Sequence, residues 1–354
     1  MTDTKYVAFD VHQATISAAV LDLSGNLITQ AVFQTGPSAI RDFLRGLTGR
    51  VHLTFEEGTQ AQWLFELTRP LVAELVVCNP RENHSMRCGS KSDRKDALQL
   101  AMLLRAGLLK SVYHGAQQTE TLKHLAHNYE AITEDTTRTM NRLKAAYRSQ
   151  AIRCAGRDVY YLRNRQQWLE KLKAEGLQRR AGFLYRQLDH LRELRREARK
   201  ALLKEARRHR AFDLLRQVPG LGPIRAAQVI AAIGSPYRFR TKRQLWAYCG
   251  FAVITRSSAD YQVSGGNLER RHKQTQTRGL NQSFSRRLKV AFKGAALEAL
   301  KTEAIKKIYE RMMASGMRAE MARLTIARKL AAVALAIWKS GEAYDEMKLS
   351  KLAA

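Results

Sequence analysis

Near the start of the chain, apolar residues come in short runs that are typical of β-strands and are separated by polar turns. Three runs follow one another closely, and a turn at Ser24-Gly25-Asn26 joins the second to the third. Each of the two later runs follows a stretch with the apolar spacing of a helix, at 38–47 and at 62–72. The five predicted strands cover residues 6–10, 16–22, 27–34, 51–55 and 75–78.

The order of these elements is strand, strand, strand, helix, strand, helix, strand, and a further helix begins near Ser92. A meander followed by parallel strands with crossover helices is the topology of the ribonuclease H-like fold. In that topology the first and fourth strands are neighbours. We therefore expect an α/β domain in which the ends of the strands at 6–10 and 51–55 lie side by side.

The rest of the chain has the apolar spacing of helices, so the fold class is α/β plus all-α. Residues 117–151 and 168–209 predict long helices, and the second carries a seven-residue repeat typical of a coiled coil. The segment 218–223, which contains Gly220 and Gly222, resembles a helix-hairpin-helix motif whose amides can hold a phosphate, although an ordinary helix-helix turn is the alternative. The repeat consists of Leu177, Leu184, Leu191 and Ala198.

The charge of the chain indicates a polyanionic partner. Its 61 Lys and Arg against 32 Asp and Glu give a formal net charge of +29, which favours nucleic acid. We expect no membrane partner, because the longest apolar run, at 331–338, is too short to span a bilayer and no leader opens the chain. The four cysteines lack C-x-x-C spacing, which favours free thiols and a cytoplasmic location.

Four acidic residues are candidates for a shared metal site. Asp10 ends the first predicted strand, Glu56 follows the fourth, and Asp93 and Asp96 lie on one face of the helix that Ser92 caps. Their carboxylates suit Mg²⁺ or Mn²⁺, and one or two such ions could assist phosphodiester cleavage. The competing interpretation is a plain helix N-terminus, where acids are favoured by the helix dipole.

Two details of the candidate chemistry stay open from the residues alone. Glu57 could serve in place of Glu56, but strand alternation points the two side chains to opposite faces, so only one can be a ligand. Ser257 and Ser258 lie in a polar, basic segment, where a serine is usually a turn or cap residue. The basic residues that we expect to contact nucleic acid are Arg256, Arg278, Arg286 and Arg287.

Together these segments resemble the DEDD transposases of the insertion-sequence 110 family, whose catalytic domain is similar to the RuvC resolvase. The resemblance covers nearly the whole chain, and the order of its motifs is more specific than any one of them. The matching motifs are Phe9-Asp10-Val11, Glu56-Glu57-Gly58-Thr59-Gln60, Asn79-Pro80, Lys91-Ser92-Asp93-Arg94-Lys95-Asp96-Ala97, Pro219-Gly220-Leu221-Gly222, and Tyr248-Cys249-Gly250 with the downstream Ser258 and Arg278-Gly279.

The resemblance implies a function for each part of the chain. Asp10, Glu56, Asp93 and Asp96 would form the metal tetrad, and Ser258 would attack a DNA phosphate to leave a covalent phosphoserine. Val253 and Ala259 depart from the family pattern, which leaves Ser257 open as an alternative nucleophile. The family also uses a structured bridge RNA that pairs with donor and target DNA.

The same resemblance implies three regions and an oligomer. Residues 1–150 would form a RuvC-like ribonuclease H-fold domain, 151–210 a coiled-coil region for dimerisation, and 211–354 a helical transposase domain with the serine. We expect a dimer, and a tetramer in the synaptic complex with the element ends and target, in the bacterial cytoplasm at the nucleoid. Because the acids and the serine lie in different domains, we expect the active site to be shared between subunits.

Two other functions fit parts of this pattern. A RuvC-like junction endonuclease would use the acids without a covalent step, and a basic nucleic-acid-binding scaffold would use neither the acids nor the serine. Substitution of the serine separates the first alternative from a recombinase, and substitution of an acid separates the second.

Overall fold

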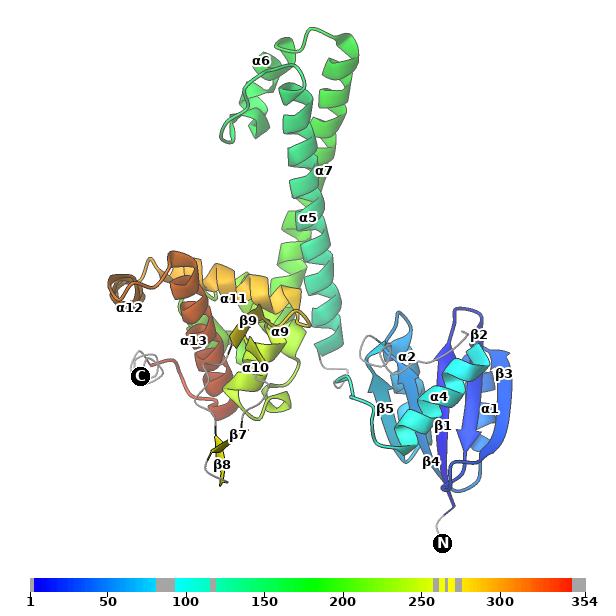
Figure 1. Cartoon of the computed structure of the whole chain (residues 1–354). Coiled ribbons are helices and arrows are strands. Elements are labelled where there is room, and N and C mark those ends of the chain that lie inside the picture. Colours follow the sequence, from blue (N-terminus) through cyan, green and yellow to red (C-terminus); the bar gives the residue numbers. More distant parts are fainter. Residues whose placement is uncertain are drawn as a thin grey trace. The chain divides into compact units, whose positions relative to one another are not determined.

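The computed structural model describes residues 3–80, 93–114, 119–256, 261–264, 267–270 and 276–345 (Figure 1). The chain divides into two compact units, Met1–His114 and Gly115–Ala354. The first unit is a sheet with helices, and the second is mostly helical. A mixed α/β N-terminal part followed by a helical remainder is therefore confirmed.

The first unit is built on one five-stranded sheet. Its order is β3-β2-β1-β4-β5, with β1 antiparallel to β2, β2 antiparallel to β3, and parallel pairing of β1 with β4 and of β4 with β5. Phe9 pairs with Phe55, which confirms that the first and fourth strands are neighbours. The strands are β1 (Thr4–Val11), β2 (Thr15–Leu21), β3 (Leu27–Gln34), β4 (Arg50–Glu56) and β5 (Glu74–Cys78).

Helices cover both faces of this sheet because strand alternation gives each face its own apolar set. On one face, α1 (Pro37–Arg45), α2 (Ala61–Thr68) and the short η1 (Arg69–Leu71) cover the side that carries Phe9 and Phe55. On the other face, α4 (Asp93–Arg105) crosses the strands (Figure 1). The α4 face is lined by small side chains, so the helix backbone can lie close to the sheet; they are Ala8, Ala19, Ala97 and Ala101.

A long helical hairpin opens the second unit. α5 (Glu120–Arg148) and α7 (Glu175–Ala206) run antiparallel and pack along each other (Figure 1). The apolar side of α7 therefore meets α5 of the same chain. A separate core that includes Tyr147, Trp168 and Tyr185 closes the far end of the hairpin. The small elements there are η4 (Asp158–Tyr160), η5 (Leu162–Asn164) and α6 (Arg165–Glu170).

The remainder of the second unit is a helical bundle around α13 (Ala319–Ser340), most of whose aliphatic side chains are buried. Two short β-pairs, which the sequence did not predict, emerge from it: β6 with β9, and β7 with β8. Among the described helices, none has both the length and the hydropathy to cross a bilayer. The other elements are α8 (Ala211–Arg216), α9 (Pro223–Ile233), η6 (Pro236–Arg238), α10 (Lys242–Tyr248), β6 (Val253–Arg256), β7 (Tyr261–Ser264), β8 (Asn267–Arg270), β9 (Gln276–Leu280), α11 (Arg286–Ala299) and α12 (Glu303–Ala314).

The cysteines that the structure describes, Cys78, Cys154 and Cys249, are buried thiols. Burial raises the pKa of the Cys249 thiol above its ordinary value. Cys78 belongs to the apolar layer under α4, and Cys249 belongs to the core of the helical bundle. Cys88 lies outside the described residues. These three thiols are packing residues, as the absence of paired spacing in the sequence led us to expect.

Gly220 is the position in the second unit where a side chain would conflict most directly with the fold. Its φ is +77°, and a Cβ there would lie 2.1 Å from the carbonyl oxygen of Ala295 on α11. We expect Gly220→Ala to lower the free energy of unfolding by about 2–4 kcal/mol, because it combines backbone strain with overpacking. Hydrogen exchange of α9 and α11, followed during unfolding by urea, measures this change in the free energy of unfolding.

Gly182 in α7 is the matched control. A Cβ at Gly182 meets no described heavy atom within 4 Å, and the residue lies inside a helix. Gly182→Ala should therefore stabilise the same unit by about 0.5–1 kcal/mol. Equal effects of the two substitutions would contradict the close approach of the hairpin turn to α11.

Candidate metal centre

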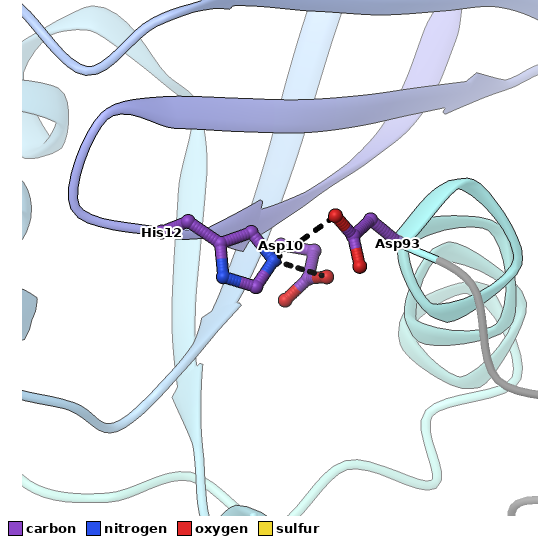
Figure 2. Close-up of side chains that lie close together, drawn as sticks. All are labelled: Asp10, His12 and Asp93. Carbon is purple, nitrogen blue, oxygen red and sulfur yellow. Dashed lines mark ion pairs between the residues drawn. The ribbon is translucent and has the colours of Figure 1, made fainter.

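Three side chains with metal-binding atoms meet beside the end of β1. The Nε2 atom of His12 lies 3.3 Å from Oδ2 of Asp10 and 3.4 Å from Oδ2 of Asp93 (Figure 2). The donor atoms of the three residues all lie within 4.8 Å of one another. Asp10 and His12 come from β1 and the turn after it, whereas Asp93 is the first residue of α4. The fold therefore brings together groups that are distant in sequence.

Strand alternation explains why Asp10 faces α4. Val7 and Phe9 enter the core on the far side of the sheet, while Ala8 packs under α4. Asp10, two residues after Ala8, lies on the same face as Ala8. Packing of Ala97 and Leu100 against that face sets the first turn of α4 next to the Asp10 carboxylate.

The electrostatics of Asp10 indicate a crowded carboxylate. Burial has the largest effect on the pKa of Asp10 and raises it above the ordinary value. His12 lowers the pKa, whereas the negative charges of Asp93 and Asp96 raise it further. Asp96 itself is only 9% exposed. Several acids in a partly buried place repel one another, and a bound cation would relieve that repulsion.

Glu56 and Glu57 have different surroundings, as alternation led us to expect. Glu56 follows Phe55, whose partner Phe9 precedes Asp10, so Glu56 and Asp10 lie on the same face of adjacent strands. Glu56 also lines a pocket of about 360 Å³ together with His12. Glu57, in contrast, is engaged by Nε2 of His114 at 2.6 Å. Glu56 therefore shares the face of Asp10, and Glu57 is paired elsewhere.

Sequence reasoning missed His12. The signal that could have found it is its spacing: His12 follows Asp10 by two residues, and residues two apart at a strand end point to the same side. Histidine is a common metal ligand. Of the predicted acids, the structure brings Asp10 and Asp93 together with His12, and Asp96 is close enough to raise the pKa of Asp10, whereas Glu56 is not one of the residues whose donor atoms meet there.

The candidate nucleophiles Ser257 and Ser258 lie outside the described residues, as does Ser92. The base of their segment is described. Arg328 on α13 donates from Nε and Nη2 to the carbonyl oxygen of Phe251, at 2.8 Å and 2.5 Å, and Asn281 N donates to the Ala252 carbonyl at 2.9 Å. β6 then pairs with β9, so the described strand that precedes the serines in the sequence is held by backbone pairing and by these hydrogen bonds.

The residues predicted to contact nucleic acid lie in different structural environments. Gly220 packs against α11, and its carbonyl accepts a hydrogen bond of 2.9 Å from Nη1 of Arg225, while Gly222 directly precedes α9. Arg256 and Arg278 lie in the paired strands β6 and β9. Arg286, the first residue of α11, is exposed.

Arg287, also on α11, is exposed, but its side chain is paired with α5. Its Nε lies 2.8 Å from Oε2 of Glu130, a half-buried carboxylate on α5, and its guanidinium also contacts His127. Gln228 on α9 donates to the same carboxylate at 3.0 Å. Burial raises the pKa of Glu130, and Arg287 opposes that shift. Glu130 therefore links α5 to α11 through Arg287 and to α9 through Gln228, a role for Arg287 that the sequence did not indicate.

A basic groove lies on the hairpin side of the second unit. It has a volume of about 780 Å³ and is bounded by α7, by Tyr129 on α5 and by Ile224 on α9. The guanidinium of Arg195 sits 5.9 Å from the centroid of the Tyr129 ring. Cations in such a groove suit a phosphate backbone. The arginines that line it are Arg192, Arg195, Arg196 and Arg199.

The raised pKa of Asp10 predicts a pH dependence of stability in the metal-free chain. Because the folded state holds this proton more tightly than the unfolded state, the free energy of unfolding falls as pH rises from the ordinary value of 3.8 through the raised one. Asp10→Asn removes this cost and should stabilise the first unit at pH 7 by on the order of 1 kcal/mol. Urea unfolding with EDTA, followed by hydrogen exchange of β1 and β4, tests this.

Asp22 provides a control of opposite sign. Hydrogen bonds from the side chain and backbone of Asn26 lower its pKa. Its contribution to stability is therefore present above pH 3.8 and is lost as pH falls through the lowered value. Asp22→Asn should destabilise the same unit at pH 7. A destabilising effect of Asp10→Asn would contradict the inference that burial dominates at Asp10.

Arg286 and Arg287 should respond differently to truncation, although each loses one positive charge. Arg287→Ala leaves the half-buried Glu130 without its ion pair and should cost about 1–3 kcal/mol of stability. Arg286→Ala should leave stability unchanged and weaken DNA binding, with the slope of log affinity against log salt reduced by about 1. Urea unfolding and fluorescence anisotropy with duplex DNA measure the two effects. Partial recovery of stability in the double variant with Glu130→Gln would identify the unpaired carboxylate as the cause.

Two models of known protein families match the chain. Residues 7–149 match a family model of the DEDD type from IS110 elements, described as a transposase. Residues 212–310 match a second model, described as a transposase of the IS116/IS110/IS902 family. Together the two matches cover most of the chain. A search of curated proteins gave no match. The chain is a DNA transposase and belongs to the IS110 family of insertion-sequence transposases.

Proposed function

We propose that this transposase cuts and rejoins DNA through a serine nucleophile assisted by a divalent cation at the acidic group beside β1. The observation that supports the proposal best is the convergence of Asp10 and Asp93 with a third donor, with Asp96 close enough to raise the pKa of Asp10. The sheet order is the one expected for a RuvC-like, ribonuclease H-like domain. Asp10, Glu56, Asp93 and Asp96 would hold the cation.

The donor set fits a hard divalent cation. Carboxylate oxygens are its preferred ligands, and a partly buried acid with a raised pKa gains most from a neighbouring positive charge. A bound cation would offset the charge of the scissile phosphate and favour loss of the serine proton. Glu57 is not part of this set, because its carboxylate is paired with His114.

Ser258 is the proposed nucleophile, with Ser257 as the alternative. Its Oγ would form a bond to phosphorus as the bond from phosphorus to the leaving deoxyribose oxygen breaks, and the proton lost by serine balances the one gained by the new hydroxyl. The covalent phosphoserine conserves the bond, so a DNA hydroxyl can later displace the serine without ATP. The described strand that precedes the serine in the sequence, β6, is held by pairing with β9 and by Arg328 at its start.

Nucleic-acid binding would use several basic surfaces. The net charge of +29 and the arginine groove along α7 support contact with phosphate backbones, and the turn at Gly220 to Gly222 would act as a helix-hairpin-helix phosphate contact. The partners would be the element ends, the target DNA and a bridge RNA that selects both. In this scheme residues 1–150, 151–210 and 211–354 are the functional regions, working in a dimer or a tetramer.

Single substitutions at the acids and at the serine test the proposal. Asp93→Asn and Ser258→Ala should each lower strand transfer at least about a thousandfold, because each removes a group needed in the transition state. Only the wild type and Ser257→Ala should form a DNA adduct that survives denaturing gel electrophoresis. An adduct with Ser258→Ala but not with Ser257→Ala would move the nucleophile to Ser257.

Controls in the same assay separate the alternatives. Full cleavage by Ser258→Ala without an adduct would identify a junction endonuclease, and unchanged activity of Asp93→Asn would identify a scaffold whose acids are not catalytic. A mixture of Asp10→Ala and Ser258→Ala chains should regain activity if two subunits share the site. Omission of the bridge RNA should abolish site-specific joining while nonspecific DNA binding persists.

A further inference from the structure

The contacts of His12 differ from those of an ordinary ion pair. One ring nitrogen faces two carboxylates, at 3.3 Å and 3.4 Å. A charge-assisted N–H···O bond is usually about 2.7–2.9 Å long, and an N–H that is shared between two acceptors makes two weaker bonds. In the same unit, His52 Nδ1 lies 2.8 Å from Oε2 of Glu74, as such a pair should. The two contacts of His12 are therefore too long and too divided to be optimised for hydrogen bonding.

The spacing does suit three ligands around one ion. Ligands bound at about 2.1 Å in adjacent octahedral positions stand about 3 Å apart, close to the separations of His12 from the two aspartates. All three donor atoms lie within 4.8 Å of one another. Figure 2 shows the imidazole edge and both carboxylates directed toward a common region between β1 and α4.

The backbone at His12 is fixed before any ligand arrives. Its N–H donates to the Thr15 carbonyl at 2.9 Å, and its carbonyl accepts a hydrogen bond of 2.9 Å from Oγ1 of Thr35. These two bonds hold the backbone of the turn between β1 and β2 beside Asp10. Binding of an ion then has to order only the half-exposed ring, because the backbone is already held.

We propose that His12 is a metal ligand together with Asp10 and Asp93, and that this centre prefers Mn²⁺ to Mg²⁺. The inference rests on the proposed function, because it names the ion of that same site. Mg²⁺ is bound almost entirely through oxygen, whereas an imidazole nitrogen gains affinity for first-row transition ions. A set of carboxylates alone would show no such preference.

Mn²⁺ itself is the probe, used with the full-length chain. Pulsed electron paramagnetic resonance should detect coupling between bound Mn²⁺ and a directly coordinated ¹⁴N nucleus in the wild type. His12→Gln should lose this coupling and bind Mn²⁺ about tenfold more weakly by titration calorimetry, while Mg²⁺ affinity changes less. His12→Asp, which restores a ligand atom, should recover Mn²⁺ affinity without the nitrogen coupling.

His52→Gln is the matched control, because His52 lies in the same sheet and pairs with Glu74 away from the centre. It should leave both the coupling and the affinity unchanged. Wild-type Mn²⁺ binding without ¹⁴N coupling, or coupling that persists in His12→Gln, would overturn the assignment of His12 and leave the carboxylate site intact. Mn²⁺ binding that survives Asp93→Asn unchanged would instead overturn the metal site of the proposed function.

Discussion

Apolar packing of α4 on the sheet holds several carboxylates close together in spite of their repulsion. The first unit depends on this constraint. Asp10, Asp93 and Asp96 are close enough that the two acids of α4 raise the pKa of the acid on β1. Nothing in their own chemistry would bring three like charges together. The small side chains between α4 and the sheet allow the helix to lie close, and that packing carries the acids with it.

This arrangement supports a candidate cation site over a plain helix N-terminus with acids. A solvated first turn would leave Asp93 and Asp96 as independent surface charges stabilised by the helix dipole. Here Asp96 is nearly buried, Asp10 is partly buried, and His12 enters from another element. The convergence of donors from separate elements is what distinguishes a binding site from a local charge preference.

In the second unit, ion pairs and hydrogen bonds join elements that are distant in the sequence. Glu130 draws Arg287 and Gln228 to one point and so joins α5, α9 and α11. Arg328 secures the strand that leads toward the serine segment by binding a backbone carbonyl. In both places an arginine contacts another group of the same chain. The large excess of positive charge elsewhere in the chain indicates a polyanionic partner.

The amino-acid sequence by itself determined the three-strand meander, the helical remainder and the polyanionic partner, because periodicity and charge are properties of short segments. The pairing of β1 with β4 was predicted from the order of the elements, which matches a known topology. The sequence also separated Glu56 from Glu57, since alternation is local. Only the tertiary structure decided that His12 meets both aspartates and that Arg287 pairs with Glu130. These outcomes depend on distances between residues far apart in the chain, which no local pattern records. The strands β6 to β9 also became visible only in the fold, because segments of four or five mixed residues are too short to show a period.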